Sequence, residues 1–195
     1  MTTTPARVLV VCTGNICRSP AAAALLRAQL SSYGIDVGSA GTAAVVGAPM
    51  TPQMRRLVEE AGADAEHAAV QLRRPAVAAA DLVLTGTAEH RGYAVRLAPG
   101  AVRRSFTLRE FARLIADAEV DQRLTPAERV AALAAHAQSH RRASGGDDIA
   151  DPFGGTQGGY DQTFAAIRGA VGVIADRVVG GRVPRVSPRR APATD

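Results

Sequence analysis

Short apolar runs alternate with helical stripes along the first half of the chain. The apolar runs predict strands near residues 7–11, 35–40 and 81–85, and a short fourth strand at about 102–105. The helical stripes between them predict helices at about 19–32, 50–62, 74–80 and 87–96. Strands that alternate with helices favour a parallel sheet covered on both faces. We therefore predict an α/β fold, a three-layer sandwich with a small parallel sheet of about four strands and helices on both faces.

Two further helical stripes fall in a stretch that we interpret as an insertion. Leu108 and Phe111 belong to the first stripe, and Thr125-Pro-Ala-Glu128 has the pattern of a capping box that opens a second helix. We predict a helical insertion at about 106–146, which is too short to bury a core of its own. An Asp-Pro loop follows it, so both a lid over that loop and a helix pair packed elsewhere fit the pattern.

The rest of the chain is one long helix and a basic tail. Apolar residues at helical intervals predict a last helix at about 159–179, and Gly180-Gly181 ends it. We expect the Pro/Arg-rich residues 182–195 to form a disordered tail. The 195 residues suit one domain with a sizeable core, which we place at residues 1–181.

Composition narrows the setting of the protein. Apolar residues make up 47% of the chain, and no apolar stretch approaches the length of a membrane span. Residues 1–7 lack a hydrophobic signal region, so we expect a cytoplasmic location and no membrane partner. The net charge is +5, and much of the positive charge lies in the tail. A solvated tail explains this charge better than a nucleic-acid partner does.

The cysteines and histidines exclude two kinds of site. Cys12 and Cys17 are the only cysteines and flank one short loop, so a structural disulfide framework is excluded. No cysteine–histidine cluster has zinc spacing. His136 and His140 stand four residues apart but have no evident carboxylate companion, which favours an exposed helix face over half of a metal site. We expect no metal and no cofactor.

The segment from Val8 to Pro20 carries the strongest chemical signal. A buried strand ends at Cys12, Arg18 follows six residues later, and Ser19-Pro20 opens an alanine-rich helix. The N–H groups of such a loop can converge on a phosphate dianion at the helix N-terminus, and the guanidinium can hold two phosphate oxygens. The same positive field favours the thiolate form of the cysteine, which then faces the phosphorus.

The loop therefore predicts both a nucleophile and a binding site. We assign Cys12 as the nucleophile and Arg18 as the residue that stabilises charge on the phosphoryl oxygens. We expect Ser19 to cap the helix or to donate its hydroxyl to the Cys12 sulfur, and Asn15 to brace the loop or simply to form its turn. The predicted phosphate-binding residues of the loop are Thr13, Gly14, Asn15, Ile16, Cys17 and Ser19.

The same loop, Val11-Cys-Thr-Gly-Asn-Ile-Cys-Arg-Ser-Pro20, resembles the signature of the low-molecular-weight protein tyrosine phosphatases. The likeness continues at Ser39-Ala-Gly-Thr42, at Asp81-Leu-Val-Leu84 with His90 behind it, and at Asp148-Ile-Ala-Asp151-Pro-Phe-Gly-Gly155, which resembles the family's general-acid loop. It covers roughly residues 6–105 and 147–180. The resemblance implies a phosphatase that acts on a phosphotyrosine protein or an aryl phosphate through a cysteinyl-phosphate intermediate.

The acid loop supplies the remaining roles. An aspartate before proline is held in an extended conformation, and we assign Asp151 as the general acid, with Asp147 and Asp148 as alternatives. Phe153 stands where the family often has tyrosine and is predicted to form a wall for the substrate ring. The resemblance also implies that Cys12 and Cys17 form a reversible disulfide. The usual aromatic wall after the Ser-Ala-Gly-Thr turn is replaced by residues 43–46, Ala-Ala-Val-Val.

Two other functions remain as alternatives at this point. An arsenate reductase on the same fold needs resolving cysteines beyond the loop, and this chain has none, so a partner thiol would be required. A non-catalytic phosphate-binding module would be expected to lack Cys12, Arg18 or the acid, and all are present. The oligomeric state is left open by the sequence.

Overall fold

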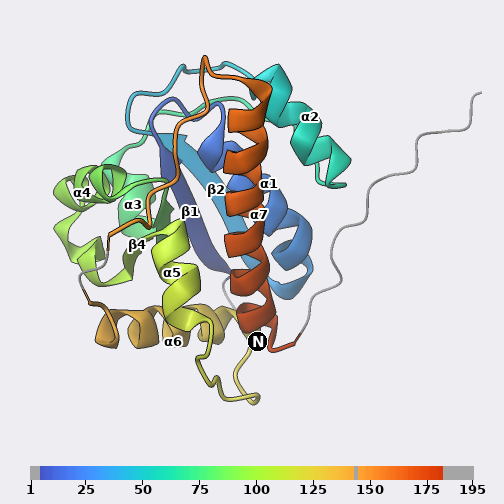
Figure 1. Ribbon diagram of the computed structural model, residues 1–195. Coiled ribbons are helices and arrows are strands. Elements are labelled where there is room, and N and C mark those ends of the chain that lie inside the picture. Colours follow the sequence, from blue (N-terminus) through green and yellow to red (C-terminus); the bar gives the residue numbers. More distant parts are fainter. Residues whose placement is uncertain (1–4, 143–144, 182–195) are drawn as a thin grey trace, which may run out of the picture.

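Four parallel strands form the sheet at the centre of the protein, in the order β2-β1-β3-β4 (Figure 1). They are β1 (Ala6–Cys12), β2 (Ile35–Gly41), β3 (Leu82–Thr85) and β4 (Ser105–Thr107). The structure is a computed structural model that describes residues 5–142 and 145–181, so the tail expected at 182–195 lies outside the described residues. β1 pairs with both β2 and β3, which places the end of β1 at the middle of the sheet.

Helices cover both faces of this sheet. They are α1 (Arg18–Leu30), α2 (Pro52–Glu60), α3 (Arg74–Ala79), α4 (Ala88–Leu97), α5 (Leu108–Ile115), α6 (Pro126–Ser139) and α7 (Gln157–Val179), with short 3-10 helices η1 (Ser31–Tyr33) and η2 (Pro99–Arg104). Strand β1 shows how the layers form, because its side chains alternate between faces. Val8 and Val10 pack in the larger core with α1, α5 and α7, whereas Leu9 and Val11 pack with α3 and α4. The predicted three-layer α/β sandwich with a four-stranded parallel sheet is confirmed.

The fourth strand lies later in the chain than predicted. Residues 99–104 form η2, and β4 begins at Ser105, so the strand expected at 102–105 is wrong except for its last residue. Val102 is 48% exposed, whereas Phe106 is fully buried and pairs with Leu84 of β3. The apolar residue that suggested a strand therefore faces out of a turn, and the true strand starts within the segment interpreted as an insertion.

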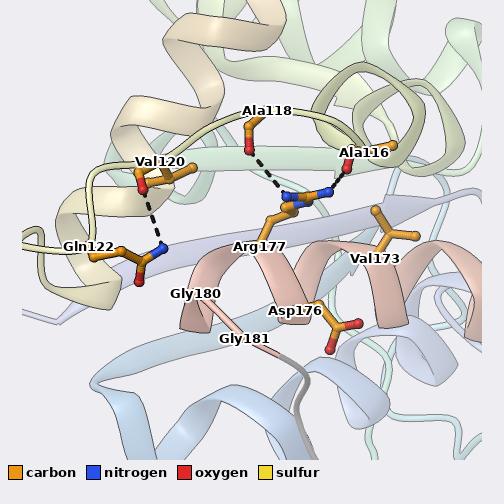
Figure 2. Close-up of a pocket in the computed structure, with 9 residues that line it drawn as sticks. All are labelled: Ala116, Ala118, Val120, Gln122, Val173, Asp176, Arg177, Gly180 and Gly181. Atoms are coloured by element: carbon orange, nitrogen blue, oxygen red, sulfur yellow. Dashed lines mark hydrogen bonds between the residues drawn. The ribbon is translucent and has the colours of Figure 1, made fainter.

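Helix α5 belongs to the main core and is not peripheral. Phe111 and Ile115 are fully buried in the larger core cluster, and α5 packs along α7. Figure 2 shows how the end of α5 is tied to the last turn of α7: the guanidinium of Arg177 donates to the carbonyl oxygens of Ala116 and Ala118. The strand and helix found at the start of the predicted insertion therefore complete the sheet and its cover.

Helix α6 lies at the end of the sheet where the strands begin, opposite the end at which β1 runs into the phosphate loop (Figure 1). Arg129 of α6 donates to the carbonyl oxygen of Val179, the last residue of α7, at 2.5 Å. Val130 and Leu133 of α6 are almost completely buried in the larger core. Of the two placements that the sequence left open, α6 takes the one away from the acid loop, because α7 starts beside that loop and α6 contacts the opposite end of α7. Among the described residues, no helix is long and apolar enough to cross a membrane.

Candidate active site

The loop between β1 and α1 is wrapped so that its carbonyl groups face outward. The carbonyl oxygens of Cys12, Thr13 and Gly14 accept hydrogen bonds from the backbone N–H groups of residues 42, 43 and 45, and that of Ile16 accepts from residue 51, at 2.9–3.1 Å. Since the C=O and N–H groups of a trans peptide unit point in opposite directions, outward carbonyls leave the loop N–H groups facing inward. This arrangement at the N-terminus of α1 is compatible with the anion-binding site that the sequence predicts.

Cys12 lies at the mouth of this concavity as the last residue of β1. Its side chain is buried, with 2% of the residue exposed, and its Sγ lies 2.9 Å from the Oγ of Ser19. Cys17 is the N-cap residue of α1, so Ser19 does not cap the helix. Of the two roles predicted for Ser19, the structure shows the contact with the Cys12 sulfur, where a donated hydroxyl hydrogen would stabilise a thiolate.

Asn15 holds the loop in a conformation that most residues avoid. Its φ is 55°, in the left-handed region, and its side chain is fully buried. The side-chain amide donates to the hydroxyls of Ser19 and Ser39 at 2.9 Å, and its oxygen accepts the N–H of Val70 at 2.8 Å. Gly41 permits this packing, because a Cβ at that position would lie 2.4 Å from the carbonyl oxygen of Thr13. Bracing and turn formation, which were predicted as alternatives, are both present.

Arg18 lies between the loop and the acid segment. Its Nη2 donates to Oδ2 of Asp151 at 2.5 Å and to Oγ1 of Thr13 at 3.3 Å, and its Nη1 donates to the carbonyl oxygen of Ile149 at 3.2 Å. The Nε of Arg18 is buried without a hydrogen-bond partner among the described residues. An unpaired donor on a buried guanidinium costs free energy unless an anion satisfies it. The geometry therefore leaves the Arg18 Nε–H ready to donate to a phosphate oxygen.

The acid loop reaches the site from the other end of the sequence. The N–H of Ile149 donates to the carbonyl oxygen of Gly86 at 2.8 Å, which fixes the loop beside the end of β3. Asp151, 133 residues after Arg18, is half exposed and turned toward the guanidinium. Phe153 is 64% exposed, and its N–H donates to Oδ1 of Asp151. The structure thus brings Cys12, Arg18 and Asp151 to one edge of the sheet, with an exposed aromatic ring near the acid.

The two alternative acids have other partners. Asp148 accepts the N–H of Ala88 at 2.8 Å, at the start of α4. Asp147 pairs with Arg113 at 2.7 Å. Both carboxylates are therefore committed to positioning the acid loop, which favours Asp151 for the proton transfer.

Cys17 lies on the other side of the loop in a closed environment. Its Sγ is 3.3 Å from Oγ1 of Thr51, and burial raises the pKa of its thiol. Cys12 and Cys17 are both free thiols in this structure. A raised pKa keeps Cys17 protonated and makes it a poor nucleophile at neutral pH.

Two histidines that were not predicted to belong to the site contact the phosphate loop. The Nε2 of His67 lies 2.6 Å from the carbonyl oxygen of Asn15, and the Nε2 of His90 lies 2.8 Å from Oγ1 of Thr13. Each is more than 50 residues away in sequence from its partner, so no local pattern could have placed it there.

In the described part of the chain, no group of three or more histidine, cysteine or acidic side chains could hold a metal ion.

Comparison with known proteins identifies the family. The model described as "Low molecular weight phosphotyrosine protein phosphatase" matches residues 7–124. A protein-arginine-phosphatase from Geobacillus stearothermophilus is 33% identical over 175 residues, covering 89% of this chain and 94% of that protein. A low molecular weight protein-tyrosine-phosphatase from Streptomyces coelicolor is 31% identical over 185 residues, with coverages of 89% and 96%.

Solved structures agree with the sequence relatives. The YwlE arginine phosphatase from Geobacillus stearothermophilus superimposes with a TM-score of 0.67 at 31% identity, covering 88% of this chain and 92% of that one. These matches favour a phosphatase over an arsenate reductase and over a non-catalytic module. The chain belongs to the low molecular weight phosphotyrosine protein phosphatase family and is a phosphatase of phosphoproteins.

Proposed function

We propose that this phosphatase hydrolyses phosphotyrosine in proteins through a cysteinyl-phosphate intermediate, with Cys12, Arg18 and Asp151 as its catalytic residues. The observation that carries the proposal is the meeting of these groups at the carboxyl edge of the sheet: a buried cysteine at the end of β1, a guanidinium at the start of α1, and a carboxylate 2.5 Å from that guanidinium. A nucleophile, a charge-stabilising donor and a proton donor are the parts that phosphate ester hydrolysis needs.

The reaction proceeds in two displacements. In the first, the Cys12 thiolate attacks phosphorus, a P–S bond forms, the P–O bond to tyrosine breaks, and Asp151 gives its proton to the phenolic oxygen. In the second, the Asp151 carboxylate takes a proton from water, the water oxygen attacks phosphorus, and the P–S bond breaks to release phosphate and restore the thiolate. Throughout, the loop N–H groups of residues 13–17 and Ser19, together with Arg18, hold the phosphoryl oxygens.

The ion pair between Arg18 and Asp151 must rearrange when substrate binds. In the substrate-free structure, Nη2 of Arg18 is shared between Asp151 and Thr13. A phosphate dianion carries more charge than one carboxylate and offers oxygens spaced for the guanidinium fork. Its arrival would free the Asp151 carboxyl to take up the proton that the first step requires.

A second substrate class is favoured by one specific observation. Of the relatives aligned over nearly the full chain, the one from Geobacillus stearothermophilus is named a protein-arginine-phosphatase. Phe153 is 64% exposed beside the acid, and an aromatic face can stack on a phenol ring or on a planar guanidinium. Phosphoarginine in proteins is therefore the competing substrate, in which a P–N bond breaks instead of a P–O bond.

The experiment has two parts. Wild type and Cys12→Ser are first assayed on p-nitrophenyl phosphate, with Cys17→Ser as the matched control from the same loop. We expect Cys12→Ser to be inactive while it still binds vanadate, and Cys17→Ser to keep most of its activity. Cys12→Ser activity within about tenfold of wild type would refute the nucleophile, since loss of an essential nucleophile costs several orders of magnitude.

The second part compares the two substrate classes directly. One peptide sequence is prepared with phosphotyrosine or with phosphoarginine at the same position, and kcat/KM is measured for each. A higher value for the phosphotyrosine peptide supports the proposal, and a higher value for the phosphoarginine peptide replaces it with the second candidate.

A cytoplasmic location completes the proposal, because a reducing compartment keeps Cys12 and Cys17 as the free thiols seen here. That residues 1–181 form a single domain also stays a prediction.

A further inference from the structure

A chain of hydrogen-bonded side chains links helix α4 to the phosphate loop. The Nδ1 of His90 lies 2.9 Å from Oγ1 of Thr87, and its Nε2 lies 2.8 Å from Oγ1 of Thr13. The same Thr13 oxygen accepts a hydrogen bond from Nη2 of Arg18 at 3.3 Å. The two displacements described above use neither the imidazole nor the threonine hydroxyl, so this connection is not explained by them.

The imidazole of His90 is held neutral in this position. Only 5% of the residue is exposed, and burial, followed by the nearby charge of Arg18, lowers its pKa. A neutral imidazole has one donor nitrogen and one acceptor nitrogen, so the direction of the hydrogen bonds depends on where the proton sits.

The surroundings of Thr87 place that proton on Nε2. As the N-cap of α4, Oγ1 of Thr87 accepts the backbone N–H of His90 at 3.3 Å. Its hydroxyl hydrogen is still available, and Nδ1 at 2.9 Å is positioned to accept it. With Nδ1 as acceptor, the proton of the neutral ring resides on Nε2 and is donated to Thr13. The opposite tautomer would leave the hydroxyl hydrogen of half-buried Thr87 without this partner.

This tautomer determines what Thr13 can do. Its oxygen accepts one hydrogen bond from His90 and one from Arg18, which uses both of its lone pairs. The hydroxyl hydrogen of Thr13 is then free for a third partner. Thr13 is an exposed residue directly after Cys12, and the Arg18 nitrogen that contacts it also contacts Asp151. The Thr13 hydroxyl thus shares an Arg18 nitrogen with the acid and belongs to the residue that follows the nucleophile.

We propose that His90 is a positioning residue that orients the Thr13 hydroxyl to donate to the transferring phosphoryl group. The inference rests on the proposed function and deepens it, because it adds a side-chain donor to the loop N–H groups and Arg18. A donor aimed at an oxygen where negative charge develops lowers the barrier more than it strengthens substrate binding. Loss of one such hydrogen bond to a charged group is expected to slow the chemical step by about tenfold.

The test measures kcat and KM on p-nitrophenyl phosphate for paired variants. Thr13→Val and His90→Leu should each lower kcat about tenfold with a smaller change in KM. Thr13→Ser keeps the hydroxyl and His90→Gln keeps an N–H donor, so both should recover most of the rate. Because the two residues act as one unit, the double variant Thr13→Val/His90→Leu should be no slower than either single variant. His140 is an exposed histidine at the C-cap of distant α6, so His140→Leu is the matched control and should match wild type.

Nitrogen-detected NMR of the histidine ring provides an independent readout that does not depend on any variant folding. We expect a neutral His90 with Nε2 protonated and Nδ1 unprotonated at neutral pH. A proton on Nδ1 would overturn the inference, as would Thr13→Val activity within about twofold of wild type or an additive loss in the double variant. These results leave the proposed function intact as long as Cys12→Ser is inactive, whereas an active Cys12→Ser enzyme would refute the proposed function itself.

Discussion

Helix α6 should stabilise the protein without taking part in the reaction, and Leu133→Ala tests this. Leu133 is fully buried in the larger core, beside Val130 of the same helix. The proposed catalytic residues Cys12 and Asp151 belong to the opposite side of the molecule, where the acid loop contacts the start of α7. The change therefore removes packing at one end of the molecule while the catalytic groups at the opposite end keep their contacts.

The expected magnitude follows from the burial of Leu133. Truncation of a fully buried leucine to alanine costs about 2–5 kcal/mol, since both the transfer free energy and the cavity contribute. Each kcal/mol lowers Tm by about 2–4 °C in a domain of this size, so a loss of about 3 kcal/mol lowers Tm by about 6–12 °C. The effect on kcat for p-nitrophenyl phosphate, expressed per folded molecule and measured well below Tm, should be small.

Urea unfolding followed by circular dichroism measures the free energy of unfolding, and turnover of p-nitrophenyl phosphate measures activity. Arg123→Ala is the matched control, because its side chain is 90% exposed just before α6, and its ion pair with Asp121 lies at the surface. The control should leave the unfolding midpoint unchanged. A deletion of residues 120–143 closed with a glycine linker should lose cooperative unfolding. A deletion that unfolds cooperatively and changes selectivity among phosphopeptides would refute this reasoning and restore the lid interpretation.

The remaining predictions concern the pocket and its support. Arg18→Lys should lower kcat/KM by at least about a hundredfold in steady-state assays, because an ammonium cannot reproduce the bidentate fork; a tenfold or smaller loss would contradict this. Asp151→Asn should slow esters of poor leaving groups far more than those of good ones, and equal slowing would move the acid role to another residue. Mild peroxide should oxidise Cys12 and Cys17 to a thiol-reversible disulfide, seen by mass spectrometry as a loss of two hydrogens; a Cys17→Ser enzyme that recovers as well as wild type would argue against it. Burial lowers the pKa of His67 below its ordinary value of 6.5, so the unfolded state binds more protons and the free energy of unfolding should fall as pH drops below about 6.5; His67→Gln should flatten that decline, and an unchanged slope would exclude the residue.

The layered fold and the phosphate loop could be predicted because their signals are local. Alternation along β1 sends Val8 and Val10 to one face and Leu9 and Val11 to the other, and the structure confirms the sheet that this pattern predicts. Cys12 and Arg18 lie in one continuous segment between a strand and a helix, so their spacing alone places them at the two ends of one short loop. The position of Cys12 at the carboxyl end of a central strand also follows from the strand order of parallel sheets.

Local patterns did not predict which surface of the protein a helix packs against. A helical stripe in α6 shows which of its faces is buried, but it does not say against which surface. The contacts of Arg129 with the end of α7 decide this, and they place α6 far from the acid loop. The strand predicted at Val102 was wrong for a related reason. One apolar residue in a turn that begins with proline shows no strand periodicity.

What the sequence by itself determined is thus the contiguous segment: the strand, the loop, and the cysteine and arginine at its two ends. The Asp-Pro loop and the family resemblance also pointed to Asp151. Only the tertiary structure decided that Asp151 contacts Arg18 from 133 residues away, and that His67 and His90 contact the loop from other elements. Such contacts depend on how the helices pack on the sheet, which is a property of the whole core. No spacing along the chain encodes them, because residues far apart in sequence meet only when that core has formed.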